Sequence, residues 1–204
     1  MSFHPLKLKK ADGTWVDLNN ETDFKKELSV NYLSTVKLGR KSYEKELRKQ
    51  SLAMKESGFL EDEQNELGLR WSRKIKEGST CSLSIQWLNE EIGFGVFAEE
   101  DIEQGQFIAE YTGVIRRSWW FWKPPSQYAF RYPTARVESK NFAIDASKEG
   151  NVTRFINHDP YGNIEAIGVY LVNDFMRVIL VSQRNIKEGS ELSFDYGINY
   201  WHNK

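Results

Sequence analysis

Cysteine and histidine are scarce in this chain of 204 residues, and their scarcity excludes several kinds of site. The single cysteine, Cys81, excludes an intrachain disulfide framework and any zinc site built from cysteines. The three histidines are scattered and do not have the spacing of metal ligands. We therefore expect a protein without a metal cofactor.

Long apolar runs and a strong net charge are also lacking. No segment stays apolar over the roughly 20 residues needed to span a membrane, and residues 1–10 do not resemble a secretory signal. A net charge of −1 argues against a strongly basic nucleic-acid-binding protein. We expect a soluble protein made in a reducing compartment, cytoplasmic or of unknown location, with nuclear action and export as an effector both left open.

The residues that are present suffice for a folded core and show two kinds of pattern. Apolar residues make up 40% of the chain, with seven Trp, nine Tyr and twelve Phe. Helical spacing predicts helices over residues 24–33, 41–57 and 61–71. From Cys81 onward, short segments typical of strands follow at 83–88, 94–98, 107–111, 169–173, 176–183 and 192–196, with a hairpin turn at Asn173-Asp174. The pattern predicts a mainly β fold of several small sheets at 81–204, preceded by a helical extension at 1–80.

Three short segments contain residue types that can carry chemistry. Gly93-Phe94-Gly95 joins two predicted strands and would let a ligand approach the backbone, although an ordinary hairpin turn is the more frequent explanation. In Arg154-Phe155-Ile156-Asn157-His158, polar side chains follow an apolar stretch, where a lone histidine is more often structural. Tyr196 ends the predicted strand of residues 192–196 and by itself could be an ordinary core tyrosine.

Taken in order, with Glu110-Tyr111-Thr112-Gly113 and Ile144-Asp145-Ala146 between them, these segments resemble the SET-domain protein lysine methyltransferases over about residues 82–201. The resemblance implies a SET fold of several small sheets with a threaded C-terminal segment. It also implies transfer of a methyl group from S-adenosyl-L-methionine to a lysine amine, without a metal. With one cysteine, the chain resembles the compact, cysteine-poor SET proteins of bacteria and viruses, which lack zinc-binding flanking modules.

The resemblance also implies a role for each motif residue. Tyr196 would be the catalytic residue that orients the amine, with Phe194 and Tyr111 beside it. The Gly93 turn would hold the methionine portion and amine of the cofactor, and the Asn157-His158 pair its adenine and ribose side. The cofactor-binding residues implied in this way are Ile92, Gly93, Phe94, Tyr128, Arg154, Asn157, His158 and Trp201, and the substrate channel would comprise Tyr111, Tyr128, Phe130, Phe194 and Tyr200.

Phe194 carries an expectation about the product. Two residues before the catalytic tyrosine, the family has either tyrosine, which can anchor a water that restricts the amine to one methyl, or phenylalanine, which leaves room for more. Because this chain has Phe194, the resemblance implies di- or trimethylation.

The implied partner is a lysine-bearing protein: a histone, a histone-like or other basic protein, or the chain itself, with the peptide bound as an added strand. Residues 81–204 hold 12 Lys or Arg against 16 Asp or Glu, which would suit a basic substrate, although sparse charges more often serve solubility. Asp159-Pro160 stands where the family has Ser-Cys, and this departure supports the alternative of a catalytically silent SET-like binding or scaffold protein. The aromatic run 119–122 is either an insert packed on the core or a patch for a partner, including a second copy in a homodimer.

Overall fold

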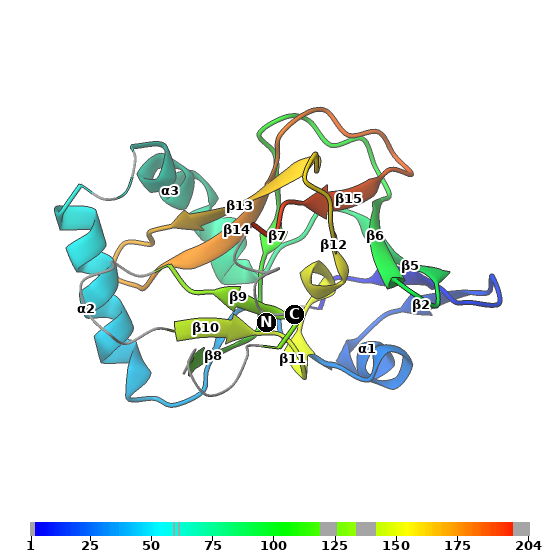
Figure 1. Ribbon diagram of the computed structural model, residues 1–204, viewed down its shortest axis with the longest axis horizontal. Coiled ribbons are helices and arrows are strands. Elements are labelled where there is room, and N and C mark those ends of the chain that lie inside the picture. The colour runs from blue at the N-terminus through cyan, green and yellow to red at the C-terminus, as the bar shows by residue number, and fades with distance from the viewer. Residues whose placement is uncertain (1–2, 59, 61, 119–125, 134–141, 198–204) are drawn as a thin grey trace.

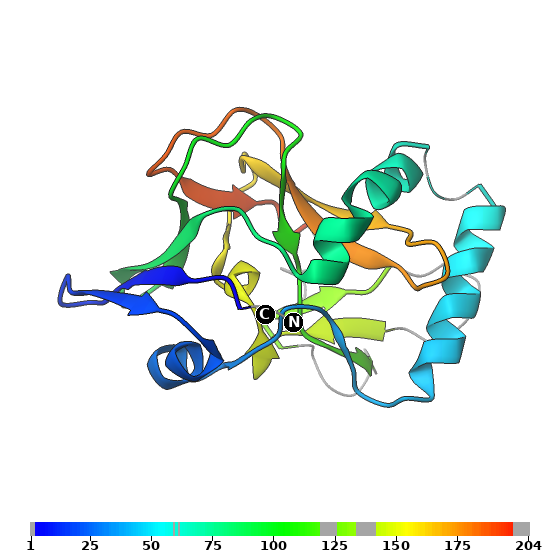
Figure 2. The same cartoon turned by 180° about the vertical axis from the view of Figure 1, so that it is seen from behind.

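A computed structural model describes residues 3–58, 60, 62–118, 126–133 and 142–197 of the chain. It contains the α-helices α1 (Glu21–Leu28), α2 (Tyr43–Glu56) and α3 (Asp62–Glu77), and a 3-10 helix, η1 (Val152–Phe155). Helices α2 and α3 lie at one end of the molecule and α1 at the other (Figures 1 and 2). Within these described ranges, no helix combines the length and apolar character that crossing a membrane requires.

The three predicted helices are confirmed, with shifted ends. Helix α1 begins earlier than expected because the side chain of Asn20 accepts hydrogen bonds from the backbone amides of Thr22 and Asp23. It ends at Leu28 because Ser29 adopts the left-handed conformation, with φ of 58°. Helix α2 buries one face, whose residues recur at helical spacing: Tyr43, Leu47, Ser51 and Met54.

In the described part of the chain, the strands are short and are distributed over four sheets. In chain order they are β1 (Leu6–Lys9), β2 (Trp15–Leu18), β3 (Asn31–Tyr32), β4 (Lys37–Leu38), β5 (Leu83–Asn89), β6 (Gly93–Ala98), β7 (Phe107–Glu110), β8 (Val114–Arg117), β9 (Ala129–Arg131), β10 (Phe142–Asp145), β11 (Glu149–Gly150), β12 (Asn157–His158), β13 (Ile164–Val169), β14 (Arg177–Ser182) and β15 (Glu191–Phe194). The sheet orders are β12-β15-β6-β5-β1-β2, β4-β8-β10-β9, β11-β3 and β13-β14-β7. The mainly β architecture of several small sheets is thus confirmed.

The N-terminal region contributes strands to three of these sheets. Strand β1 pairs in parallel with β5, β3 pairs with β11, and β4 pairs with β8. Only helices are predicted in this region from the sequence, because strands of two to four residues are too short to show a period. Residues 1–80 therefore share sheets with the rest of the described chain, and the boundary near residue 80 stays a prediction.

One predicted strand is misplaced along the chain. Residues 169–173 were expected to form a strand, but β13 ends at Val169 and the chain turns through Asn173, whose φ is 60°. The antiparallel pairing of β13 with β14 confirms the predicted hairpin. The apolar residues after β13 do not form strand because they pack elsewhere: Leu171 lies in the core under α3, and the ring of Tyr170 lies under the Lys55 ammonium of α2, 5.1 Å away.

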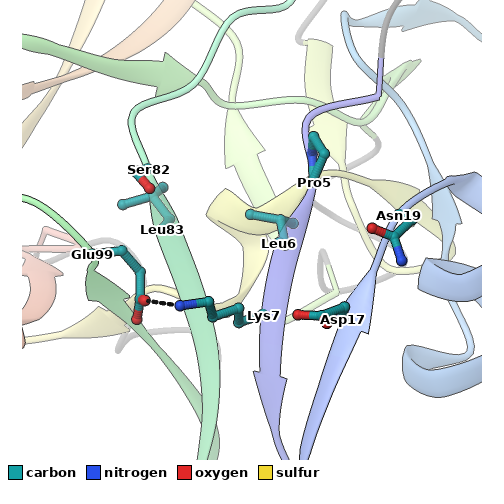
Figure 3. A pocket seen from close by; sticks show the side chains of 8 residues that line it. All are labelled: Pro5, Leu6, Lys7, Asp17, Asn19, Ser82, Leu83 and Glu99. Carbon is teal, nitrogen blue, oxygen red and sulfur yellow. Dashed lines mark hydrogen bonds and ion pairs between the residues drawn. The ribbon is translucent and has the colours of Figure 1, made fainter.

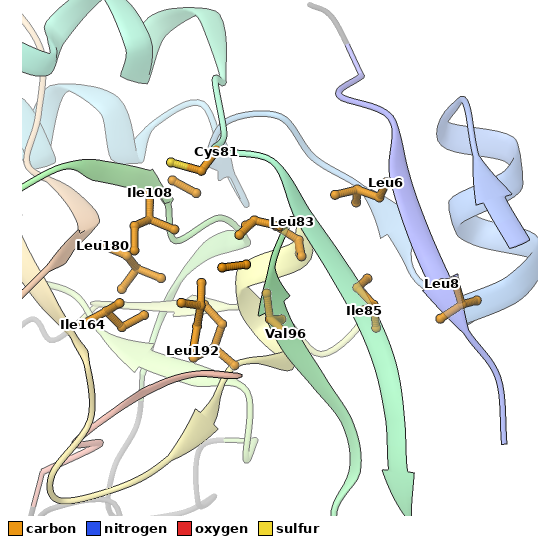
Figure 4. Close-up of a cluster of buried hydrophobic side chains, with 14 of the residues drawn as sticks. Leu6, Leu8, Cys81, Leu83, Ile85, Val96, Ile108, Ile164, Leu180 and Leu192 are labelled. Atoms are coloured by element: carbon orange, nitrogen blue, oxygen red, sulfur yellow. The ribbon is translucent and has the colours of Figure 1, made fainter. Parts of the chain in front are cut away.

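The largest core cluster ties the two ends of the chain together. Buried side chains from β1, β5 and β6 meet Ile108 of β7, Leu180 of β14 and Leu192 of β15 (Figure 4). Strand β15 lies between β12 and β6, so the C-terminal segment is inserted between two earlier parts of the chain. Burial of Leu192, which has 0% exposure, helps to hold the segment there.

Candidate active site

The three motif segments meet around β15. Strand β12 runs parallel to β15, with Asn157 opposite Ser193 and His158 opposite Phe194. On its other edge β15 pairs with β6, whose first residue is Gly93. Segments that are about 35 and 60 residues apart in the sequence therefore form one surface, visible where β12, β15 and β6 lie next to one another in Figure 1.

Helix η1 lies just before the Asn157-His158 pair in the chain and positions it at this surface. Its N-cap, Asn151, accepts hydrogen bonds from the amide and the hydroxyl of Thr153, at 3.1 and 2.7 Å. The Asn151 side chain also donates to the carbonyl of Glu110 at 2.9 Å, which ties η1 to β7. The side-chain polar atoms of Asn151 and Thr153 therefore have hydrogen-bond partners within the fold. These hydrogen bonds fix the direction in which the chain leaves η1 and enters β12.

Arg154 packs against two aromatic residues of the site. Its Nε donates to the carbonyl of Ala146 at 2.8 Å, and its guanidinium lies 4.0 Å from the ring centre of Tyr128 and 4.5 Å from that of Phe155. Burial lowers the pKa of the Arg154 guanidinium, whose charge the two aromatic faces partly compensate. Phe155 in turn packs edge-on against Phe94, with ring centres 5.9 Å apart. Arg154 therefore connects Tyr128 with the aromatic side chain of the Gly93 turn.

The side chain of Asn157 reaches the Gly93 turn. Its Nδ2 donates to the carbonyl oxygen of Phe94 at 3.2 Å and to Oε1 of Glu191 at 3.0 Å. Gly93 has a φ of 84° and open space where a Cβ would be, so a ligand can approach the backbone there. Ile92, just before the turn, is 53% exposed. Glu191 was not among the residues predicted to form the site; the available signal was its position at the start of the apolar segment that forms β15.

A hydrogen bond from a backbone amide links Tyr196 to the side chain of His158. The amide of Tyr196 donates to Nδ1 of His158 at 3.1 Å, which makes Nδ1 an acceptor and, in the neutral ring, leaves the proton on Nε2. The hydroxyl of Tyr196 donates to the carbonyl of Ile156 at 2.5 Å, and its ring centre lies 4.8 Å from that of Phe194. Phe194, the last residue of β15, and Tyr196, two residues further along the chain, thus have adjacent rings, and the tyrosine hydroxyl is fixed by a main-chain carbonyl.

The described channel residues form an aromatic wall in two parts, one with Tyr111 and the other with Phe194. Tyr111 donates through its hydroxyl to the carbonyl of Tyr128 at 2.7 Å, and its ring centre lies 5.4 Å from that of Phe130. Phe130 packs against both the cluster that includes Phe194 and the cluster that includes Tyr111. Phe130 therefore connects the two halves of the wall. Tyr200, Trp201 and the aromatic run 119–122 lie outside the described residues.

The departure at Asp159-Pro160 builds a well-satisfied loop. The side chain of Asp159 accepts from the amide of Tyr161 at 2.8 Å, its carbonyl accepts from the amide of Gly162 at 3.0 Å, and its own amide donates to the carbonyl of Phe194 at 3.1 Å. Such an Asx turn gives a short loop a defined shape. The loop therefore remains hydrogen-bonded to β15 with aspartate in this position.

Asn163 fastens the end of this loop to β15 on both sides of Leu192. Its Nδ2 donates to the carbonyl of Glu191 at 2.8 Å, and its Oδ1 accepts from the amide of Ser193 at 3.1 Å. Its backbone amide also donates to the carbonyl of Ser193 at 3.0 Å. Asn163 was not among the residues predicted to form the site.

Replacing Asn163 by alanine is expected to lower the free energy of unfolding by about 2 kcal/mol, because two hydrogen bonds to partly buried backbone groups are lost. Chemical denaturation followed by fluorescence would measure this. Asn19→Ala, at an exposed position of the β2–α1 connection, should change stability by less than about 0.5 kcal/mol. Equal effects of the two substitutions would contradict the assigned role of Asn163.

A separate shallow pocket lies at the junction of β1, β2 and β5, away from the motif segments (Figure 3). Its lining is mostly polar, and an ion pair between Lys7 and Glu99, 3.2 Å apart, spans one side. None of its lining residues belongs to the three motifs. Over the described part of the chain, no three or more His, Cys, Asp or Glu side chains are grouped so that they could hold a metal ion.

Comparison with known proteins places the chain in a family. A profile described as the SET domain matches residues 93–197, about half of the chain, and the chain belongs to the SET-domain family. The histone-lysine N-methyltransferase SUV39H2 of Xenopus tropicalis is 33% identical over 132 residues, which cover 61% of this chain and 32% of that protein. The chain thus spans about a third of the length of this relative.

Two solved structures are similar in fold. ATXR5 in complex with histone H3.1 superposes with a TM-score of 0.64 at 22% identity, covering 86% of this chain and 84% of that chain. A Chaetomium thermophilum polycomb repressive complex 2 structure, described as autoinhibited and bound to S-adenosylmethionine, has a TM-score of 0.50 at 28% identity, covering 66% of this chain and 18% of that chain. The predicted SET fold is thereby confirmed.

Proposed function

We propose that this chain is an S-adenosylmethionine-dependent protein-lysine N-methyltransferase. The observation that carries the proposal is the meeting of the Asn157-His158 pair, the Gly93 turn and Tyr196 around one inserted strand. The relatives named histone-lysine N-methyltransferases support it, as does the described complex of a similar structure with S-adenosylmethionine. Apart from Asn157, whose side chain reaches the Gly93 turn, each motif residue is proposed in the role that the resemblance implies.

The residues present fit such a cofactor. Gly93 leaves its backbone open, Asn157 has an amide oxygen available beside it, Phe94 adds an aromatic ring at the same turn, and the Arg154 guanidinium holds the Tyr128 ring in place. When bound, S-adenosylmethionine would supply a methyl group attached to a positively charged sulfur. Ile92, Arg154 and His158 complete the described part of the proposed binding site, and Trp201 is proposed from the sequence.

The chain's residues would prepare the lysine for attack. A lysine ammonium has a reference pKa of about 10.4 and must lose a proton before its nitrogen can accept a methyl group. The aromatic wall of Tyr111, Phe130 and Phe194 would remove water from the amine, which disfavours the charged form and lowers that pKa. Tyr196, whose hydroxyl is fixed by the Ile156 carbonyl, would orient the neutral amine, so alignment supplies much of the rate.

The proposed substrate is a histone or another lysine-rich basic protein. The names of the relatives support a histone, and the excess of acidic over basic residues in 81–204 suits a basic peptide. The test is transfer from labelled S-adenosylmethionine to core histones and to a whole-cell lysate, read by mass spectrometry. We expect labelled lysine. Cofactor binding without transfer to any lysine would instead support the silent binding protein.

We further propose that the product is di- or trimethyllysine, because Phe194 presents no hydroxyl to hold a blocking water beside Tyr196. Phe194→Tyr is expected to shift the product toward monomethyllysine by about tenfold, the effect of one added hydrogen-bonding group. Counting methyl groups by mass spectrometry on the same peptide, with wild type and variant side by side, measures the shift. A wild-type series that stops at one methyl would refute the product assignment.

A further inference from the structure

The side-chain amide of Asn157 lies between two acceptors, and this fixes which way it faces. Its Nδ2 is 3.2 Å from the carbonyl oxygen of Phe94 and 3.0 Å from Oε1 of Glu191. A carbonyl and an ionised carboxylate only accept hydrogen bonds, so the amide nitrogen, and not its oxygen, must face them. The two amide hydrogens match the two acceptors. Oδ1 is then the side-chain atom that remains to accept a hydrogen bond from a ligand.

The backbone of Glu191 is fixed in a position from which its carboxylate can accept the hydrogen bond from Asn157. Its carbonyl accepts from the side chain of Asn163 at 2.8 Å, and its backbone is paired with Phe97 of β6. Its carboxylate lies directly over Gly95, where an added Cβ would be only 2.7 Å from Oε1. The lack of a side chain at residue 95 therefore gives the Glu191 carboxylate its path to Asn157.

We propose that Glu191 is a positioning residue, which turns the Asn157 amide so that Oδ1 accepts a hydrogen bond from the amino group of the cofactor. This inference rests on the proposed function. Because Asn157 is anchored on the carbonyl of Phe94, its side chain lies at the turn proposed to bind the methionine portion. An ammonium group only donates, so Oδ1 suits it, whereas a reversed amide would direct N–H groups at it.

The test compares two ligands that differ only in the amino group: S-adenosylhomocysteine and 5′-deoxy-5′-(3-carboxypropylthio)adenosine. Titration calorimetry with the full chain is expected to show that Glu191→Ala weakens S-adenosylhomocysteine binding about tenfold and binding of the desamino ligand less than about twofold. Glu191→Met, which keeps the length of the side chain without an acceptor, should behave like alanine. Glu191→Gln keeps an acceptor oxygen and should lose less than about threefold.

Glu188→Ala is the matched control, since Glu188 is exposed and lies three residues earlier, in the turn before β15. Thermal melting of each variant shows whether it is folded, and Glu191→Met carries the test if alanine does not fold. Equal weakening of both ligands, no weakening of either, or a loss in Glu191→Gln as large as in Glu191→Ala would overturn the inference alone. A wild-type chain that binds neither ligand would overturn the proposed function and this inference with it.

Discussion

Tyr196→Phe is expected to lower the rate of methyl transfer by at least about 100-fold, while S-adenosylhomocysteine binding changes by less than about threefold. Phenylalanine keeps the ring contacts with Phe194 and His158, at 4.8 and 5.4 Å between ring centres, and the backbone hydrogen bond to His158. Only the hydroxyl, held by the Ile156 carbonyl, is lost. Single-turnover transfer and titration calorimetry separate the two effects.

Tyr161→Phe provides the control for this loss. Tyr161 is 84% exposed and lies in the loop after His158, so removing its hydroxyl should leave transfer unchanged within about twofold. If Tyr196→Phe retained most of the wild-type rate, the tyrosine would be a packing residue, and the orientation of the amine would have to come from another group.

Gly162→Ala is expected to be the most destabilising single substitution in the loop of residues 159–163. An added Cβ would lie 2.3 Å from the carbonyl oxygen of Ser193 and 2.6 Å from Cα of Phe194, and both are backbone atoms that cannot turn aside. Either the loop or β15 must move, at a cost of about 3 kcal/mol in the free energy of unfolding. For a chain of this size, that loss lowers Tm by roughly 6–12 °C. Differential scanning calorimetry would measure it.

Gly105→Ala separates crowding from backbone strain. Gly105 has a φ of 77°, and no atom lies within 4 Å of the position its Cβ would take, so alanine there incurs only the cost of the left-handed conformation. That cost is about 1 kcal/mol. A similar small loss in Gly162→Ala would mean that the loop can move away from β15 freely. In that case S-adenosylhomocysteine binding should also survive the substitution.

Local signals in the sequence predict much of this protein. The apolar spacing of α2 and the alternation of β5 are long enough to show a period, and both elements form where expected. The motif segments are equally readable, because each joins rare residue types at short spacing. The failures have two causes. Strands β3 and β4 have two residues each and are too short to show a period. The apolar residues after Val169 pack against α2 and α3 instead of continuing a strand.

The candidate site divides in the same way. Asn157, His158 and Tyr196 are recognisable from their neighbours in the chain, whereas Glu191 and Asn163 acquire their contacts only when β15 is inserted between β12 and β6. An isolated glutamate before a strand, or an asparagine in a loop, has many ordinary explanations. Nothing in the spacing of the residues indicates which acceptor will face which donor.

The sequence by itself determined the family, the mainly β fold and the identity of the motif residues, because these depend on short-range patterns. The tertiary structure alone decided which groups those residues meet. It pairs the N-terminal strands with strands of the SET core. It also holds the Tyr196 hydroxyl at the carbonyl of Ile156 and directs the Asn157 amide toward Phe94 and Glu191. The physical reason is that hydrogen bonds across about 30 to 60 residues of chain require the whole core to bring the partners to about 3 Å from each other.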